Sequence, residues 1–445
     1  MVEADWEQPG EDAGRTVGER VRSLRRSAGL SQEALAAGRF SKEYVSQIER
    51  GKTRPTPETL EWLAARLATD RDFLEHGFSR AAAEQSEAAV RNAEQLVEAR
   101  RDEEAVAAYR DARARAGAAL TPRLALRLLR GEAWALIRTG DLDAAMSALE
   151  EAAAVAIGPG FTDVDRAAVV FLVGVVRYSQ SSIREAVGLF DQALVLAEGS
   201  SSDLDRLRSD IFHWRSRCHR RNRDWVAAAE DIERALELAE ASDDMRRVAD
   251  ALFQASLVAQ RQGRWVRART DAERSRAIFE ELGDRATAAR LLNNLAGLDH
   301  LLGDESGAIA LLERAFEIFV DEDLPVDAGY VCASLAEIRL ACDEPKSAED
   351  QARKALELLG DRLDHLQEIG TAQLALGRAL AAQGRLDDAE AAIAAAEATF
   401  EQARSAGHRS YAWVARGDLQ SQRGNDRDAA DLYRRAARAL QDADV

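Results

Sequence analysis

Side chains that often catalyse reactions or bind metals are present in this sequence, but they form no recognisable catalytic pattern. His213 and His219 lie six residues apart, whereas two ligands on one helical face lie about four apart. The sequence has no P-loop, G-x-S-x-G, H-E-x-x-H or dinucleotide-binding glycine motif. Cys218, Cys332 and Cys342 form no C-x-x-C pair, and an odd number suits no disulfide framework. We therefore expect no enzyme activity, no metal and no cofactor, and a reducing cytoplasmic location.

Charge is distributed unevenly along the 445 residues. Residues 1–14 carry five acids and no base, and we expect them to form a disordered acidic tail. Residues 15–80 have a net charge of +4 and residues 81–445 a net charge of −17, within a total of −18. A small basic module thus precedes a large acidic body, and only the basic module has a charge that favours binding to a polyanion. No run of apolar residues is long enough to cross a membrane.

A pattern with a period of 40 to 42 residues runs through the acidic body. Nine segments that read as a turn followed by a helix each place an alanine at the same point. These alanines are Ala105, Ala145, Ala186, Ala228, Ala268, Ala308, Ala348, Ala389 and Ala429. A second small residue follows seven positions later, on the same helical face. Because only seven prolines interrupt the chain and aromatic residues are few, the pattern predicts nine helix pairs in an all-α protein.

The nine units resemble tetratricopeptide repeats, because a third small residue lies twelve positions before each alanine. These residues are Ala93, Ala133, Gly174, Ser216, Ser256, Ala296, Ala336, Gly377 and Gly417. The period exceeds the usual 34 by about six residues, as in the long-helix repeats of bacterial peptide-sensing regulators. The resemblance covers residues 81–441 and implies a right-handed α-solenoid of about nine helix pairs.

Residues 15–78 read as short helices, with Ser31, Ser41 and Thr56 as predicted N-caps. The motifs GERVRSLRRSAGLSQEALA, SKEYVSQIERG and PETLEWLA resemble the Xre or phage-repressor class of helix-turn-helix domains. This resemblance implies a five-helix domain that binds double-stranded DNA. The helix from Ser41 to Arg50 would then lie in the major groove.

The same resemblance implies which residues contact DNA. Lys42, Glu43 and Gln47 would face bases, and Ser41 and Tyr44 would flank them. Gln32 would hold a phosphate, and Lys52 and Arg54 would meet the DNA backbone. Glu49 is expected to be a buried partner of Arg25, since buried charges require pairing. The role of Arg50 stays open.

In tetratricopeptide proteins the first helix of each pair lines a concave face, so the resemblance also implies a candidate effector site. Its residues combine arginine, aromatic and carboxamide side chains. They are Arg130, Trp134, Tyr178, His213, Trp214, Arg217, Arg220, Gln254, Arg261, Arg290, Asn293 and Asn294. Carboxamides pair with a peptide backbone, arginine clamps carboxylates and aromatic rings supply anchors. The alternative is a solvated face whose aromatic rings pack between helices.

The sequence therefore predicts a sequence-specific DNA-binding transcriptional regulator, of the kind used in quorum sensing, whose repeats bind a peptide or protein effector. A homodimer is expected, because one helix-turn-helix head reads only half of a two-fold operator. Two alternatives stay open. The repeats could be a scaffold or adaptor that regulates a partner, or the protein could regulate a neighbouring enzyme, with DNA binding secondary in both.

Overall fold

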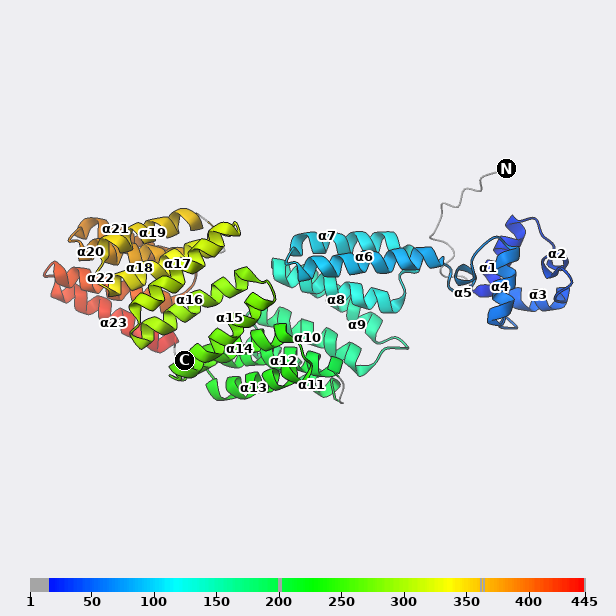
Figure 1. Ribbon diagram of the computed structural model, residues 1–445, viewed down its shortest axis with the longest axis horizontal. Helices are drawn as coiled ribbons and strands as arrows, with labels where there is room; N and C mark the ends of the chain where they lie inside the picture. The colour runs from blue at the N-terminus through cyan, green and yellow to red at the C-terminus, as the bar shows by residue number, and fades with distance from the viewer. Residues whose placement is uncertain (1–15, 199–201, 361, 363–364, 444–445) are drawn as a thin grey trace. The chain divides into compact units, whose positions relative to one another are not determined.

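The computed structural model describes residues 16–198, 202–360, 362 and 365–443, and the predicted acidic tail at 1–14 lies outside them (Figure 1). The described residues form helices and no β-strand, which confirms the all-α prediction. The chain divides into two compact units, Met1–Ser200 and Ser201–Val445. This division falls within the repeats, not between the predicted head and the repeats. No helix of the described part is both long and apolar enough to cross a bilayer.

Five short helices form the head of the chain. They are α1 (Val17–Ser27), α2 (Gln32–Ala36), α3 (Lys42–Glu49), α4 (Pro57–Arg66) and α5 (Arg71–His76). The side chains of Ser31, Ser41 and Thr56 each accept a hydrogen bond from the backbone N–H three residues later. The three predicted N-caps are thereby confirmed, and each satisfies a backbone donor that the helix leaves without a partner.

The head packs around a small apolar core. Its fully buried members are Val21, Leu35, Val45, Ile48, Leu63 and Leu74. Helix α1 crosses α3 so closely that a Cβ atom at Gly18 would lie 2.2 Å from the Ile48 carbonyl oxygen. Between α2 and α3 the chain reverses through Ala37 and Gly38, whose φ angles are +43° and +74°. This core holds α3 in place and leaves its other side to solvent.

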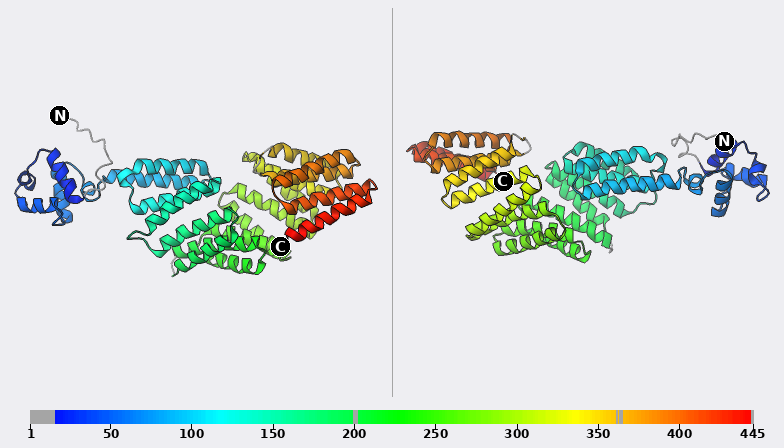
Figure 2. Two further views of the ribbon diagram at one scale, coloured as in Figure 1. Left: turned by 180° about the vertical axis from the view of Figure 1, so that it is seen from behind. Right: turned by 45° about the horizontal axis from the view of Figure 1, so that its top comes forward.

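Among the described residues, nine helix pairs follow the head, three in the first unit and six in the second. Their helices are labelled in Figure 1. The first unit contains α6 (Arg80–Glu98), α7 (Asp102–Ala116), the short 3-10 helix η1 (Gly117–Ala119), α8 (Pro122–Thr139), α9 (Leu142–Ala156), α10 (Asp163–Ser179) and α11 (Ile183–Leu196). The second unit contains α12 (Ser202–Arg221), α13 (Trp225–Ala241), α14 (Met245–Arg261), α15 (Trp265–Glu281), α16 (Arg285–Leu302), α17 (Glu305–Asp321), α18 (Pro325–Ala341), α19 (Pro345–Leu359), α20 (Leu366–Ala382), α21 (Leu386–Gln402), α22 (Ala406–Gln422) and α23 (Asp426–Ala443). Within the second unit, paired helices lie side by side in both views of Figure 2.

The predicted small residues lie where the two helices of a pair approach each other. All nine repeat alanines are buried, with at most 3% of their surface exposed. The glycines of the first helices face bulky side chains of the second: a Cβ at Gly174 would lie 2.6 Å from the Phe190 ring. At the equivalent position of its pair, Ser216 makes a hydrogen bond across the close contact. Its hydroxyl donates to the Ala228 carbonyl at 2.7 Å. The close approach thus excludes larger side chains at these points.

Ion pairs connect the first helices of successive pairs. Arg247 of α14 donates two hydrogen bonds to Asp210 of α12, at 2.9 and 2.8 Å. Arg290 of α16 makes an equivalent two-bond contact with Asp327 of α18, at 2.7 and 3.0 Å. Such bidentate pairs fix the relative orientation of their two helices. Part of the arginine content therefore stabilises the stacking of repeats.

Replacing Gly377 by leucine is expected to lower the free energy of unfolding by about 1–3 kcal/mol, because overpacking strains a tight contact. A Cβ there would lie 2.5 Å from the Ile393 side chain and 3.2 Å from its backbone nitrogen. Gly297 is the matched control, since its Cβ would meet no atom within 4 Å. Urea unfolding followed by circular dichroism would contradict this account if Gly377→Leu and Gly297→Leu unfold at the same midpoint.

Candidate functional site

Helix α3 presents one polar face to solvent and one face to the core of the head. Val45, Ile48 and Glu49 are buried, whereas Lys42, Glu43 and Gln47 are exposed. Ser41 is the N-cap of α3, and its hydroxyl accepts from the Tyr44 N–H at 3.0 Å. The first turn of α3 therefore points its polar side chains away from the protein, as a helix that reads base edges must.

The exposed groups around α3 are mostly donors. The side-chain oxygen of Gln47 accepts a hydrogen bond from the Thr53 hydroxyl at 3.1 Å, which leaves its NH₂ group to donate. Lys52 and Arg54 follow α3 and are exposed. Within the described part of the chain, no ion pair joins Lys42, Lys52 or Arg54 to a carboxylate. These cations are therefore available to phosphates.

Tyr44 has a different environment from the other predicted contact residues. It is half-buried, and its ring lies 5.3 Å from the Phe40 ring, at the edge of the core. Phe40 in turn meets Trp62 edge-on, with 5.1 Å between ring centroids. Tyr44 therefore helps to fix the orientation of α3 relative to the core of the head.

The structure adds Ser46 and Arg50 to the face of α3. Ser46 is half-buried and Arg50 is exposed. Ser46 lies three residues after Glu43, and Arg50 lies three residues after Gln47. This is the spacing of neighbours on one helical face. The sequence alone leaves the role of Arg50 open. Its spacing from Glu43 and Gln47 is the signal that indicates a shared helical face.

The buried Glu49 accepts three hydrogen bonds beneath this face. Arg25 donates to Glu49 from Nε at 2.5 Å and from Nη2 at 3.0 Å, and Gln32 donates at 2.9 Å. The predicted pair of Arg25 and Glu49 is thus present. Gln32 donates one N–H of its amide to Glu49, and its other N–H can donate to a phosphate, so the phosphate contact stays a prediction.

The same contacts set the protonation of Glu49. Burial raises the pKa of its carboxyl, but the hydrogen bonds from Arg25 and Gln32 outweigh burial, so the pKa falls below the ordinary 4.5. The hydrogen bond to Glu49 also raises the pKa of Arg25. Both groups are therefore charged at neutral pH, and the pair links α1 to the C-terminal end of α3.

Of the residues predicted for the effector site, three lie in the first unit. Arg130 and Trp134 are half-buried on α8, and Tyr178 is half-buried on α10. Within the described residues, the Nε of Arg130 is buried without a hydrogen-bond partner. Burial lowers the pKa of Arg130, and the carboxylate of Asp165 opposes this effect. A half-buried arginine whose Nε lacks a partner is a candidate anion-binding group.

The other nine predicted residues lie in the second unit, on three successive first helices. His213, Trp214, Arg217 and Arg220 are on α12. The guanidinium of Arg217 lies 4.1 Å from the Trp214 ring centroid, a cation–π contact. Burial, followed by the charges of Arg217 and Arg220, lowers the pKa of His213 to about 3. His213 is therefore neutral at physiological pH.

Helices α14 and α16 supply the remaining five residues. Gln254 is buried and Arg261 is exposed on α14. Asn293 and Asn294 are half-buried on α16, and the side-chain oxygen of Asn293 has no hydrogen-bond partner among the described residues. Arg290 donates two hydrogen bonds to Asp327, which compensates its charge, and its contact with an effector stays a prediction.

Neither the cysteines nor the acidic clusters form a chemical site in the described residues. No group of three or more histidine, cysteine, aspartate or glutamate side chains there could hold a metal. Burial raises the pKa of the Cys218 thiol to about 12 and that of Cys332 to about 11. Both thiols therefore stay protonated, which makes them poor nucleophiles.

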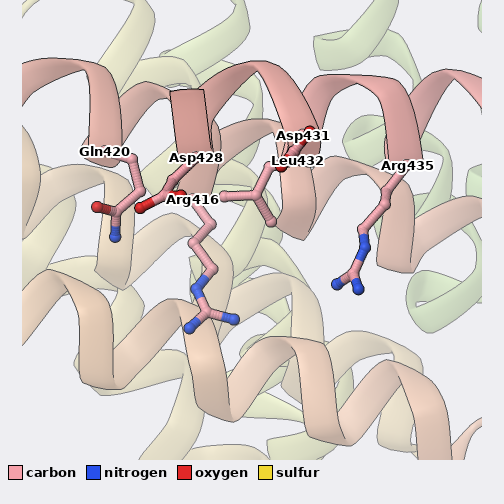
Figure 3. Close-up of a pocket in the computed structure, with 6 residues that line it drawn as sticks. All are labelled: Arg416, Gln420, Asp428, Asp431, Leu432 and Arg435. Carbon is pink, nitrogen blue, oxygen red and sulfur yellow. The ribbon is translucent and has the colours of Figure 1, made fainter. Parts of the chain in front are cut away.

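A cavity of about 300 Å³ lies between α22 and α23, away from the predicted residues (Figure 3). Its lining is Arg416, Gln420, Asp428, Asp431, Leu432 and Arg435. Leu432 lies between the two arginines, Arg416 and Arg435 (Figure 3). Arg416 already pairs with Glu390 at 2.7 Å and Glu397 at 3.2 Å. The charge of Arg416 is thus already compensated by two carboxylates of α21.

Comparison with known proteins supports both parts of the chain. Residues 16–76 match a family described as a helix-turn-helix domain, and residues 247–319 match the tetratricopeptide repeat. The uncharacterised helix-turn-helix transcriptional regulator y4dJ of Sinorhizobium fredii is 44% identical over 57 residues, which cover 13% of this chain and 74% of that protein.

Two solved structures share the fold at low sequence identity. The apo form of the quorum sensor NprR from B. thuringiensis is 12% identical with a TM-score of 0.59, over 80% of this chain and 99% of that one. A Rap protein complexed with Competence and Sporulation Factor is 15% identical with a TM-score of 0.56, over 81% of this chain and 99% of that one. The repeat fold of this chain is thus found in known proteins.

Replacing Arg25 by alanine is expected to destabilise the head by about 3–5 kcal/mol at neutral pH, because Glu49 would keep a buried charge without its partner. The pKa of Glu49 is lowered by folding, so the stabilisation is present above 4.5 and is lost as the pH falls through the folded-state value. The difference in the free energy of unfolding between the variant and the wild type should therefore become smaller at acidic pH.

Hydrogen exchange of the α3 amides in the full chain measures the difference in stability between the Arg25→Ala variant and the wild type. Arg26→Ala is the control, since Arg26 is exposed on the same helix. A surface change of this kind shifts stability by no more than about 0.5 kcal/mol. Equal protection of α3 in the Arg25 and Arg26 variants would show that the pair does not stabilise the head.

Proposed function

We propose, for a chain that belongs to the helix-turn-helix transcriptional regulators, that α3 reads an operator and that the repeats bind a peptide effector. The chain is a transcriptional regulator built from a DNA-binding head and a tetratricopeptide body. The observation that carries the operator proposal is the solvent-facing side of α3, where Lys42 and Gln47 present donors and no ion pair in the described chain engages Lys42. Lysine and glutamine donors suit the acceptor atoms of purines in the major groove.

The effector proposal rests on polar groups of the first helices that are buried without partners. The Asn293 oxygen and the Arg130 Nε are such groups within the described residues. A buried polar atom left without a partner costs about 1–3 kcal/mol, so a ligand that supplies the partner gains that energy. A peptide can supply a partner to either group in its own unit, because peptide N–H groups donate to an amide oxygen and peptide carbonyls or carboxylates accept from arginine.

The structural relatives are consistent with a peptide effector. The Rap structure contains Competence and Sporulation Factor, and NprR is described as a quorum sensor. We propose that peptide binding in the repeats changes how the head engages DNA. A homodimer that binds two half-sites is part of this proposal.

Replacing Lys42 and Gln47 together by alanine is expected to abolish preference for the operator and to leave helicity unchanged, because both side chains are exposed. Each lost base contact costs about 1–3 kcal/mol. The measurement is a titration of operator and scrambled DNA at one salt concentration. Glu61→Ala is the control, because Glu61 is exposed on α4. Unchanged operator affinity in the double variant would mean that α3 does not read the bases.

Replacing Arg217 by glutamate is expected to weaken a peptide that carries a carboxylate by about 2–5 kcal/mol, because an attractive charge becomes repulsive. Calorimetric titration with peptides captured from a library by the purified chain measures this loss. Arg234→Glu is the matched control, since Arg234 pairs with Glu237 on the second helix α13. If the Arg217→Glu variant binds the peptide with wild-type affinity, Arg217 is not part of the effector site. Operator binding that no captured peptide alters would favour the adaptor function.

A further inference from the structure

At the crossing, each first helix of the second unit has a partly exposed residue between two buried ones. It comes directly after the small residue of the crossing, and the residue that follows it is buried in all six helices. We call these six residues the front row. They are Arg217, Leu257, Gly297, Glu337, Arg378 and Asp418. Because neighbouring first helices lie next to one another, the front row crosses the second unit from α12 to α22.

Glu337 is an acid of the front row that the protein does not neutralise. No hydrogen bond or ion pair engages its carboxylate within the described part of the chain. Asp418, the other acid of the front row, accepts a hydrogen bond from the Tyr433 hydroxyl at 2.7 Å. Near the start of the same helix as Glu337, Asp327 is held by Arg290. The Glu337 carboxylate thus differs from these acids, because it is left for a partner outside the chain.

Protein surrounds Glu337 although its side chain reaches solvent. Glu337 is exposed, yet burial raises the pKa of its carboxyl above the ordinary 4.5. The positive charges of Arg378, His300 and His408 oppose this effect without cancelling it. Arg378, on the next first helix, forms no ion pair with Glu337 in the described chain. The charged form of Glu337 therefore lacks a direct partner, and a ligand cation in contact with it would supply one.

Gly297 is the front-row residue of α16, the first helix that precedes α18. Glycine weakens the interior of a helix, so it usually has a packing reason. Such a reason is present at Gly329, Gly370 and Gly377, where a Cβ atom would lie 2.9, 2.6 and 2.5 Å from a side chain of the paired helix. At Gly297 a Cβ atom would meet nothing within 4 Å. The space in front of Gly297 is therefore open, so a ligand can approach the backbone of α16 closely.

Asn293 lies four residues before Gly297, which places both residues on one face of α16. Its side-chain oxygen is buried and has no hydrogen-bond partner among the described residues. An unpaired buried oxygen favours a ligand that brings a donor to it. The main-chain N–H groups of a peptide are such donors, and the open space at Gly297 gives a peptide backbone room on this face. Asn293 and Gly297 therefore suit the main chain of a ligand, and Glu337 suits a charged group on that ligand.

We propose that the peptide effector crosses α16 in front of Gly297 and places a positive charge against Glu337. This inference rests on the proposed function, since it concerns the peptide that the repeats bind. The charge belongs to the N-terminal amine of the peptide or to a lysine or arginine side chain, because each of these donates charge-assisted hydrogen bonds to a carboxylate. Arg217 lies on the other side of Gly297, two first helices away on α12. The front row thus selects a peptide with an acidic group towards α12 and a basic group towards α18.

The first test presents a random library of linear peptides with free termini to the immobilised full chain and identifies the retained peptides by mass spectrometry. Peptides retained by the wild type should be enriched in a cationic group. The Glu337→Gln variant should lose this enrichment, and Glu337→Lys should enrich acidic peptides instead, because its charge is reversed. Glu357→Lys is the matched control and should retain the wild-type set, since Glu357 is exposed on the second helix α19.

The second test measures the dissociation constant of one retained synthetic peptide by calorimetry. Glu337→Gln should raise this constant about tenfold, and Gly297→Leu should raise it about tenfold or more by filling the open space. Arg378→Gln should lower the constant, because a positive charge near the bound cation is removed. N-acetylation of the peptide, or replacement of its lysine by norleucine or of its arginine by citrulline, shows which group Glu337 binds. Urea unfolding followed by circular dichroism checks that each variant is folded.

The outcomes separate this inference from the proposed function. Retained peptides without cationic enrichment, or equal affinity in Glu337→Gln and wild type, would overturn the inference and leave peptide binding intact. If Glu337 serves only to pair with Arg378, both glutamine variants would lower the urea midpoint and leave peptide affinity unchanged. A wild-type chain that retains no peptide at all would overturn the peptide effector and this inference together.

Discussion

The close approach of the two helices in each repeat is the constraint on which the rest of this structure depends. The repeat alanines and the small residues of the first helices leave no room for a larger side chain at the crossing. Because the crossing recurs every 40 to 42 residues, the first helices of the second unit lie next to one another in one layer. Nine of the twelve residues predicted to bind an effector lie on α12, α14 and α16 of the second unit, and the other three lie on α8 and α10, which are first helices of the first unit. The position of each along its helix follows from the crossings.

A second constraint acts on the arginines, because many serve the stack itself. Arg247 and Arg290 are each held by a carboxylate of a neighbouring first helix. In the head, Arg25 is similarly held by Glu49 beneath α3. A bidentate contact of this kind both fixes orientation and satisfies charge. The arginines that remain for ligands and DNA are therefore fewer than the composition suggests.

The sequence predicts those features that depend on local periodicity. The nine alanines, the N-caps Ser31, Ser41 and Thr56 and the pair of Arg25 and Glu49 are all found where they are expected. These features follow from spacing along one helix or from the resemblance of a short motif. The exposure of Lys42, Glu43 and Gln47 follows in the same way, since Val45 and Ile48 on the other side of the helix are core.

Contacts between distant long side chains are not predictable in this way. Gln32 bonds to Glu49, 17 residues away, and Arg290 bonds to Asp327, 37 residues away. Which acid a flexible arginine or glutamine reaches depends on the rotation between successive helices, and no local pattern encodes that rotation. The low pKa of His213 also depends first on burial, which no local pattern gives. The division of the chain at Ser200 likewise has no signal in the regular period.

In the proposed function, the head reads a specific DNA sequence under the control of the repeat domain. Sequencing the genomic fragments that the purified full chain retains at physiological salt is the decisive measurement. We expect strong enrichment of a few sites that share one two-fold symmetric sequence, because two heads read two half-sites. Retention of fragments in proportion to their length, with no shared sequence, would contradict it.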